Sequence, residues 1–293
     1  MAASAQPTRP ITRNVRVNGI RLYYYEWRTK PGSTEPPILI AHATGFHGHC
    51  YGAIAEAFPD RRVIALDMRG HGQSEGSTIE NWRTLVEDVN QFLDQLRIRR
   101  AIGVGHSMGA HVLLNCAAER SEAFSRLVLF DPVVMEPSYY APVPGERAAD
   151  APHPTIRRKR DFASPEAMMA RFAGREPYSL FDRRVFEDYC RYGLRKQTGG
   201  DYVLSCTPEM EASVYATSFT NAGIHEAARS VGIPVWVVRA QQGERTFQSS
   251  PTWPALASIM PNGIDLYRPD RTHFHPFEDP ADAARIIAEA AAS

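Results

Sequence analysis

Short apolar runs mark two regions of the chain, one before residue 132 and one after residue 232. The runs have the length and composition of strands in a largely buried parallel sheet. Ahead of them, Asn14–Gly19 and Arg21–Trp27 alternate apolar and polar residues across Asn18-Gly19, which predicts a hairpin. The later strands are predicted over Ile38–Ala41, Arg62–Leu66, Ala101–Val104, Leu127–Phe130, Val235–Val238 and Ile264–Tyr267.

Helical patterns lie between these runs. From Trp82 to Leu96, apolar residues recur at spacings of three and four and form one apolar helix face, and Pro280–Ala291 has the pattern of a final helix. Strands that alternate with helices predict an α/β fold, a mostly parallel sheet flanked by helices.

Residues 132–232 interrupt this alternation. They show no buried-strand pattern, several prolines, many arginines and short helical stretches such as Pro165–Phe172 and Arg183–Tyr192. We therefore expect one core domain, made of residues 1–131 and 233–293, with a mainly helical cap subdomain over 132–232.

Composition and charge exclude several classes of partner. The 33 basic and 33 acidic residues cancel, so no overall field attracts nucleic acid or an anionic membrane. The basic run Arg157–Arg160 is interpreted as a solvated helix face. The polar N-terminal stretch has no apolar signal region, and no run is long enough to span a membrane, so we expect a cytoplasmic protein. The four cysteines form no metal-binding or disulfide pattern, and neither a metal nor an organic cofactor is expected.

The strongest chemical signal is the sequence Gly105-His106-Ser107-Met108-Gly109. It follows a predicted strand and opens an apolar helix over Ala110–Ala118. Such a sharp turn presents a serine hydroxyl at the carboxyl edge of the sheet, and the flanking glycines remove side chains that would collide there. Ser107 is therefore predicted to be a nucleophile.

Three further segments stand in a matching order: 42–46 and 67–74, each directly after a predicted strand, and 273–280, before the final helix. Together with the serine motif they resemble the α/β-hydrolase fold superfamily. The resemblance covers roughly 15–131 and 233–293, with the insertion in the place of the family's cap. It implies a serine nucleophile, a histidine base and an acidic partner, in that class of fold.

The base and the acid follow from this resemblance. The block from Thr272 to Pro280 resembles the family's ending around its catalytic histidine and selects His273, with His275 as the alternative. Many members carry the acid after the penultimate strand, where this chain has only Glu244. Asp131 stands at the family's other acid position, as in the haloalkane dehalogenase branch and certain lactone hydrolases, and is favoured over Glu244.

Two backbone N–H groups are expected to hold the developing oxyanion, those of Met108 and, by the resemblance, Thr44. Cap side chains should line an apolar pocket over Ser107. The candidate substrate-binding residues are His106, Phe46, Tyr139, Tyr140 and Met135.

These features favour a serine hydrolase that cleaves a carboxylic ester or lactone through an acyl-enzyme. The expected partner is a small, apolar or aromatic substrate, and a homodimer is possible. The alternatives are a C–C bond hydrolase or a perhydrolase with the same triad, and a binding protein of this fold without catalysis. A serine at position 107 disfavours reactions that need an aspartate nucleophile.

Overall fold

The computed structural model describes residues 9–28, 32–140, 153–243 and 248–293. An eight-stranded sheet in the order β1-β2-β4-β3-β5-β6-β10-β11 forms its centre. β1 and β2 make the predicted antiparallel hairpin, β2 also pairs antiparallel with β4, and the remaining neighbours are parallel. The strands are β1 Ile11–Val17, β2 Ile20–Trp27, β3 Ile38–Ala41, β4 Val63–Leu66, β5 Ala101–His106, β6 Phe124–Phe130, β10 Val235–Ala240 and β11 Gly263–Arg268.

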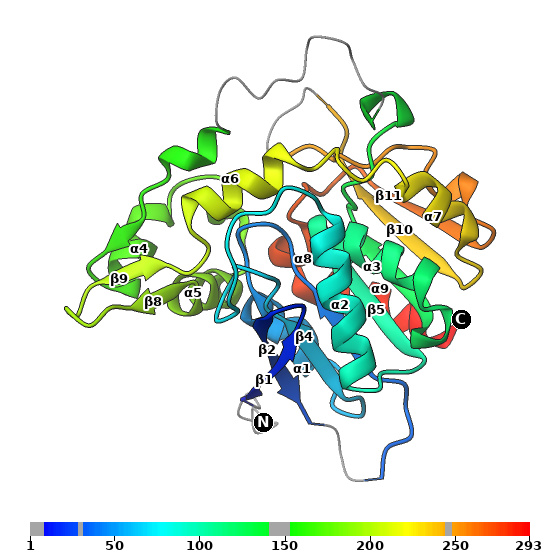
Figure 1. Ribbon diagram of the computed structural model, residues 1–293, viewed down its shortest axis with the longest axis horizontal. Helices are drawn as coiled ribbons and strands as arrows, with labels where there is room; N and C mark the ends of the chain where they lie inside the picture. The colour runs from blue at the N-terminus through cyan, green and yellow to red at the C-terminus, as the bar shows by residue number, and fades with distance from the viewer. Residues whose placement is uncertain (1–8, 29–31, 141–152, 244–247) are drawn as a thin grey trace.

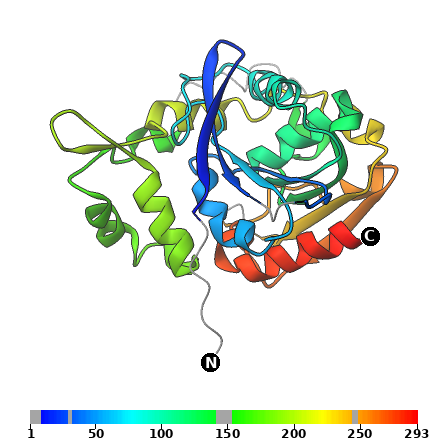
Figure 2. The same cartoon turned by 90° about the horizontal axis from the view of Figure 1, so that it is seen from below.

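Helices cover both faces of this sheet (Figure 1, Figure 2). Alternate residues of one strand enter different hydrophobic clusters: Leu39 packs with one face and Ile38 and Ile40 with the other. One face is covered by α2 (Arg83–Gln95) and α3 (Met108–Glu119). The opposite face is covered by α1 (Gly52–Glu56) and α9 (Pro280–Ala292), with the short α8 (His275–Glu278) just before α9. The predicted α/β architecture is confirmed.

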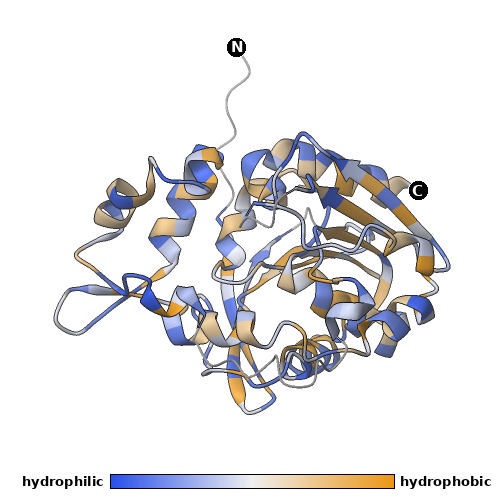
Figure 3. Ribbon diagram, turned by 90° about the horizontal axis from the view of Figure 1, so that it is seen from above, coloured by the Kyte–Doolittle hydropathy of each residue, from blue (hydrophilic) through white to orange (hydrophobic). Residues whose placement is uncertain are grey.

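Hydrophobic side chains supply the packing between these layers. In Figure 3 hydrophobic positions gather on the inner strands, whereas the helices also carry hydrophilic positions. The strands β3 and β4 are buried along their whole length, as their apolar sequences require. None of the described helices is long and apolar enough to cross a membrane.

Residues 153–232 contain short helices and a small sheet beside the core domain (Figure 1). The helices are α4 Pro165–Phe172, α5 Arg183–Tyr192, α6 Pro208–Ala216 and α7 Ile224–Ser230. The strands β7 Asp161–Phe162, β8 Leu194–Lys196 and β9 Tyr202–Leu204 form an antiparallel sheet that the sequence analysis missed. These strands have only two or three residues each, too few for an alternating pattern to be recognised.

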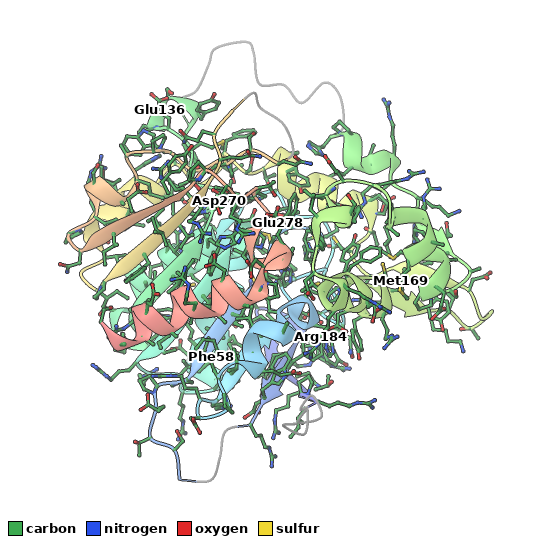
Figure 4. The ribbon with its side chains drawn as sticks, turned by 180° about the vertical axis from the view of Figure 1, so that it is seen from behind. Phe58, Glu136, Met169, Arg184, Asp270 and Glu278 are labelled. Atoms are coloured by element: carbon green, nitrogen blue, oxygen red, sulfur yellow. The ribbon has the colours of Figure 1, made fainter. Side chains whose placement is uncertain are left out.

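The cap residues contact the core through specific bonds. Arg184 of α5 makes a two-point salt bridge to Glu56 at the end of α1, with N–O distances of 2.7 and 2.5 Å, and it is labelled between these elements in Figure 4. On the other side of the cap, the indole of Trp82 donates to the Val214 carbonyl at 2.9 Å. Helix α7 shares a buried cluster with α3, so it packs on the core domain although it lies before residue 233. The boundaries of the two domains remain our proposal.

Arg158 corrects the interpretation of the basic run as a solvated helix face. The guanidinium forms an ion pair with Glu211, whose side chain is 3% exposed, and donates to the hydroxyls of Tyr178 and Tyr189 at 3.1 and 2.8 Å. A carboxylate buried this deeply requires a charged partner. One member of the run is therefore part of the cap interior, while Arg157, Lys159 and Arg160 are exposed.

Candidate active site

Ser107 lies at the turn between β5 and α3, with a strained backbone of φ 56° and ψ −115°. A residue with a side chain adopts such angles only when surrounding bonds enforce them, at a cost of about 1–3 kcal/mol. Here the Ser107 N–H donates to the Phe130 carbonyl at 2.9 Å, and the Ser107 carbonyl accepts from His111 N–H at 3.2 Å. The turn is thus held by the neighbouring strand and by the first turn of α3.

The glycines of the motif allow the close packing of this turn. A Cβ on Gly105 would lie 2.3 Å from the Ala110 Cα, and a Cβ on Gly109 would lie 2.1 Å from the Ala41 carbonyl oxygen. Both contacts are with atoms that cannot move away as a flexible side chain can. The start of α3 therefore packs directly against the end of β5 and the end of β3.

His273 lies within hydrogen-bond distance of the serine. Its Nε2 is 3.0 Å from Ser107 Oγ, and its Nδ1 is 2.5 Å from Asp131 Oδ2. The carboxylate can only accept when ionised, so Nδ1 carries the proton and Nε2 is free to accept from the serine hydroxyl. The alternative base His275 instead bonds Asp282 through Nε2 at 2.7 Å, so the structure does not bring it to the serine.

Asp131 follows β6 and is buried. Its second oxygen, Oδ1, accepts from the Ala240 N–H at 3.1 Å and from the Ser250 hydroxyl. Burial by itself would raise the pKa of Asp131, but the hydrogen bond and electrostatic interaction with His273 and the hydrogen bond from Ser250 outweigh it, and the pKa is lowered. The carboxylate is therefore kept ionised. Glu244, the alternative acid, lies outside the described residues.

The backbone N–H groups of the loop 42–46 differ in whether they have an acceptor within the protein. The Ala43 N–H donates to Tyr51 Oη at 3.3 Å, Gly45 N–H to His71 Nε2 at 3.0 Å and Phe46 N–H to the Ala43 carbonyl at 3.2 Å. Within the described part of the chain, the Thr44 N–H has no such acceptor.

Met108 offers the second backbone donor. Because it is the first residue of α3, its N–H has no acceptor inside the helix. Thr44 lines the same pocket as Ser107. Met108 directly follows Ser107, and the oxyanion role of these two N–H groups remains our proposal.

The pocket above Ser107 has a volume of about 220 Å³. Of the predicted substrate-binding residues, only Met135 lines it. Most of the other lining residues could not be predicted from the sequence, because they come from distant segments that only the fold brings together. The lining consists of Thr44, Trp82, Ser107, Val133, Met135, Tyr215, Ser218, Ser249, Pro251 and His273.

Four predicted substrate-binding residues lie elsewhere among the described residues. His106 is fully buried and contacts Tyr51 and the His273 backbone rather than the pocket. Phe46 packs against Phe277 with ring centroids 4.7 Å apart. Tyr140 packs against a histidine ring, and Tyr139 lines a neighbouring hollow of about 410 Å³ that shares Met135 with the pocket. Tertiary packing, and not sequence position, decides which of these side chains face the pocket.

Several buried histidines are held neutral around the site. Burial is the main cause that lowers the pKa of His47, His71 and His111 to about 4 and that of His106 to about 3. These rings are buried, and their nitrogens have hydrogen-bond partners within the protein. Adding a second proton to any of them therefore costs free energy. Among the described residues, no group of three or more His, Cys, Asp or Glu side chains could hold a metal ion.

These histidines predict that acid destabilises the fold. The unfolded chain takes up protons below the ordinary histidine pKa of about 6.5, whereas the folded chain does not until about pH 4. The histidine contribution to stability is thus complete above pH 6.5 and is lost as the pH falls toward 4. Urea unfolding between pH 7.5 and 4.5 should show the free energy of unfolding decrease steadily.

The variant His111→Gln provides the control for this prediction. It removes one titrating group, so the slope near pH 5 should become shallower by about 1 kcal/mol per pH unit. A wild-type free energy of unfolding that stays constant from pH 6.5 to 4.5 would contradict the neutral state of these rings.

The fold and the strained serine turn define the class: a parallel sheet with a nucleophile elbow, as in α/β-hydrolases. The model of the alpha/beta hydrolase family matches residues 38–286. The chain therefore belongs to the alpha/beta hydrolase family.

Curated relatives include lipases. The chain is similar to the monoglyceride lipase of Mus musculus, with 31% identity over 137 residues, 44% of this chain and 45% of the lipase. It is also similar to the sn-1-specific diacylglycerol lipase of Danio rerio, with 23% identity over 275 residues, 90% of this chain and 80% of that protein. The chain thus spans less than half the length of the first of these relatives.

Solved structures share the fold over almost the whole chain. An E-2-(acetamidomethylene)succinate hydrolase has a TM-score of 0.74 and 21% identity, and the match covers 96% of this chain and 98% of the other. The enol-lactonase from Burkholderia xenovorans has a TM-score of 0.65 and 20% identity, with 94% and 98% covered. At these identities the likeness establishes the fold.

Proposed function

We propose that this chain is a serine hydrolase that cleaves a carboxylic ester or lactone through an acyl-enzyme on Ser107. The observation that carries the proposal is the continuous hydrogen-bonded line from Ser107 Oγ through the His273 ring to Asp131. A serine hydroxyl is a weak nucleophile at neutral pH and needs a base at this distance.

In the first half of the reaction, Ser107 Oγ attacks the carbonyl carbon as its proton passes to His273 Nε2. The Thr44 and Met108 N–H groups stabilise the negative charge on the carbonyl oxygen. Asp131 keeps the Nδ1 proton in place and stabilises the imidazolium. The intermediate then collapses, and the alcohol leaves with the proton from Nε2.

In the second half, His273 takes a proton from a water molecule, which attacks the acyl carbon. The intermediate expels Ser107 Oγ, which recovers its proton from Nε2, and the carboxylic acid is released. This mechanism sets no requirement on the identity of the alcohol that leaves from the ester or lactone. Apart from the substrate and this water molecule, the steps use the side chains and backbone groups described above.

The lining of the pocket supports an apolar acyl group of modest size. Trp82, Val133 and Met135 provide apolar walls, and the volume of about 220 Å³ limits what can lie next to Ser107. The lipases and the lactonase among the similar proteins are named for ester and lactone substrates, in line with this choice. A cytoplasmic location and a homodimer stay predictions from the sequence.

A substrate panel tests this proposal. We expect turnover of p-nitrophenyl esters with short acyl chains and of simple lactones, with the rate falling as the acyl chain outgrows the pocket. The experiment measures kcat and KM for a series of esters from acetate to decanoate. A vinylogous diketone is assayed in parallel. Turnover of the diketone without any ester or lactone hydrolysis would replace the proposal with C–C bond hydrolysis.

A further inference from the structure

His106, the residue before the nucleophile, uses both of its ring nitrogens inside the protein. Nε2 lies 2.8 Å from the backbone carbonyl oxygen of His273, and Nδ1 lies 2.9 Å from Tyr51 Oη. A carbonyl can only accept, so Nε2 carries the proton, and Nδ1 therefore accepts from the Tyr51 hydroxyl. The ring thus has one defined tautomer.

Tyr51 continues this line toward the oxyanion loop. It ends the 3₁₀ helix η1 (Gly48–Tyr51) and is 1% exposed, and its oxygen accepts the Ala43 N–H at 3.3 Å. One chain of hydrogen bonds therefore runs from Ala43 N–H to Tyr51, from the Tyr51 hydroxyl to His106, and from His106 to the His273 carbonyl.

The two ends of this hydrogen-bond chain lie next to two groups with proposed roles in the reaction. Ala43 directly precedes Thr44, whose N–H is the proposed oxyanion donor, and the other end is the backbone of the proposed base. The loop 42–46 and the loop that carries His273 come from segments more than 200 residues apart in the sequence. Among the described residues, the bonds of Tyr51 and His106 link these loops through side chains.

The surroundings keep this link rigid and uncharged. Phe277 packs edge-on against the His106 ring at 5.1 Å. Burial, and then the charge of the nearby His273, lower the pKa of His106 to about 3, so the ring does not gain a second proton near neutral pH. The carboxylate of Asp131 and the ring of His275 are the other titratable groups that act on it.

We propose that Tyr51 and His106 are positioning residues that hold the oxyanion donor and the base at a fixed separation around Ser107. This inference rests on the proposed function. A displacement of about 1 Å at such a site can reduce the rate about 100-fold, so a bond chain between the two loops has a direct effect on kcat.

The test begins with Tyr51→Phe, which removes one oxygen atom and breaks the chain in its middle. We expect kcat for a p-nitrophenyl ester to fall about tenfold while KM stays within about twofold, because the pocket lining is unchanged. The kcat of His106→Leu should fall at least as far as that of Tyr51→Phe. His106→Gln should recover activity to within about threefold of wild type, because the glutamine amide can donate to the His273 carbonyl.

The double variant Tyr51→Phe/His106→Leu separates positioning from general destabilisation. If the two residues act as one chain, its kcat falls no further than that of His106→Leu alone. The matched control is Tyr25→Phe. Tyr25 is also 1% exposed and donates to a buried carboxylate, Asp67, at 2.7 Å, but it bonds neither loop end. It should lose thermal stability and keep kcat within about twofold.

Three results would overturn the inference: an unchanged kcat for Tyr51→Phe, losses that multiply in the double variant, or an equal loss of kcat in Tyr25→Phe. All rates are compared with a wild type that hydrolyses the same ester. Full activity of Tyr51→Phe would therefore remove the positioning role and leave the serine mechanism standing, whereas full activity of Ser107→Ala would remove the mechanism itself.

Discussion

Replacing Ser107 with alanine should lower kcat for ester hydrolysis by about 10⁴–10⁶-fold, with a KM close to that of the wild type. The alanine lacks the oxygen that attacks the carbonyl, while the Thr44 and Met108 N–H groups and the pocket lining remain. The residual rate would come from substrate binding and oxyanion stabilisation alone. The measurement is release of p-nitrophenol from a short-chain ester, with enough enzyme to detect the residual rate.

Ser258→Ala is the control for this variant. Ser258 is exposed and its hydroxyl donates only to the nearby Ala255 carbonyl at 2.7 Å. Its kcat should equal that of the wild type. A Ser107→Ala enzyme that retains more than a tenth of the wild-type rate would show that another group attacks the substrate.

Asp131→Asn should lower kcat by about 10⁴-fold without unfolding the protein. The amide oxygen can still accept from the Ala240 N–H and the Ser250 hydroxyl, so the local structure is supported. The amide NH₂ would then face His273 Nδ1 and favour the tautomer with its proton on Nε2, which cannot accept from Ser107. The kinetic loss, measured beside an unchanged circular dichroism spectrum, tests the role of the acid.

Two further variants identify the acid. Asp67→Asn changes another buried aspartate, which stands just after β4, bonds the Gly48 N–H at 2.8 Å and does not contact His273. It should lower stability and leave most of kcat intact. Glu244→Gln should have no effect. A loss of activity in Glu244→Gln with a fully active Asp131→Asn would reassign the acid to Glu244.

The core strands and the serine turn are features that the sequence pattern predicts correctly. Ile38–Ala41 is a short apolar run because both of its faces are buried, so composition alone indicates the strand. The motif around Ser107 is local, and its glycines reflect contacts of 2.1 to 2.3 Å that any side chain would create. Local requirements of this kind determine the residue types, so they can be recognised from the sequence.

The residues around the site were harder to predict, because their positions depend on tertiary packing. Trp82 was assigned only to a helix face, yet it lines the pocket. His106 is a candidate substrate-binding residue by sequence, but at the end of β5 its side chain points into the interior and bonds Tyr51. Arg158 lies in a basic run that resembles a solvated surface, and only its buried partner Glu211 reveals its role.

The central claim is that Ser107 becomes covalently acylated, and one measurement tests it directly. Wild-type protein is treated with a fluorophosphonate, digested, and its peptides are mapped by mass spectrometry, with Ser107→Ala treated in parallel. We predict a single adduct on Ser107, loss of ester hydrolysis in proportion to labelling, and no adduct in the variant. An adduct on another residue, or full labelling of Ser107 with unchanged hydrolysis, would contradict the account.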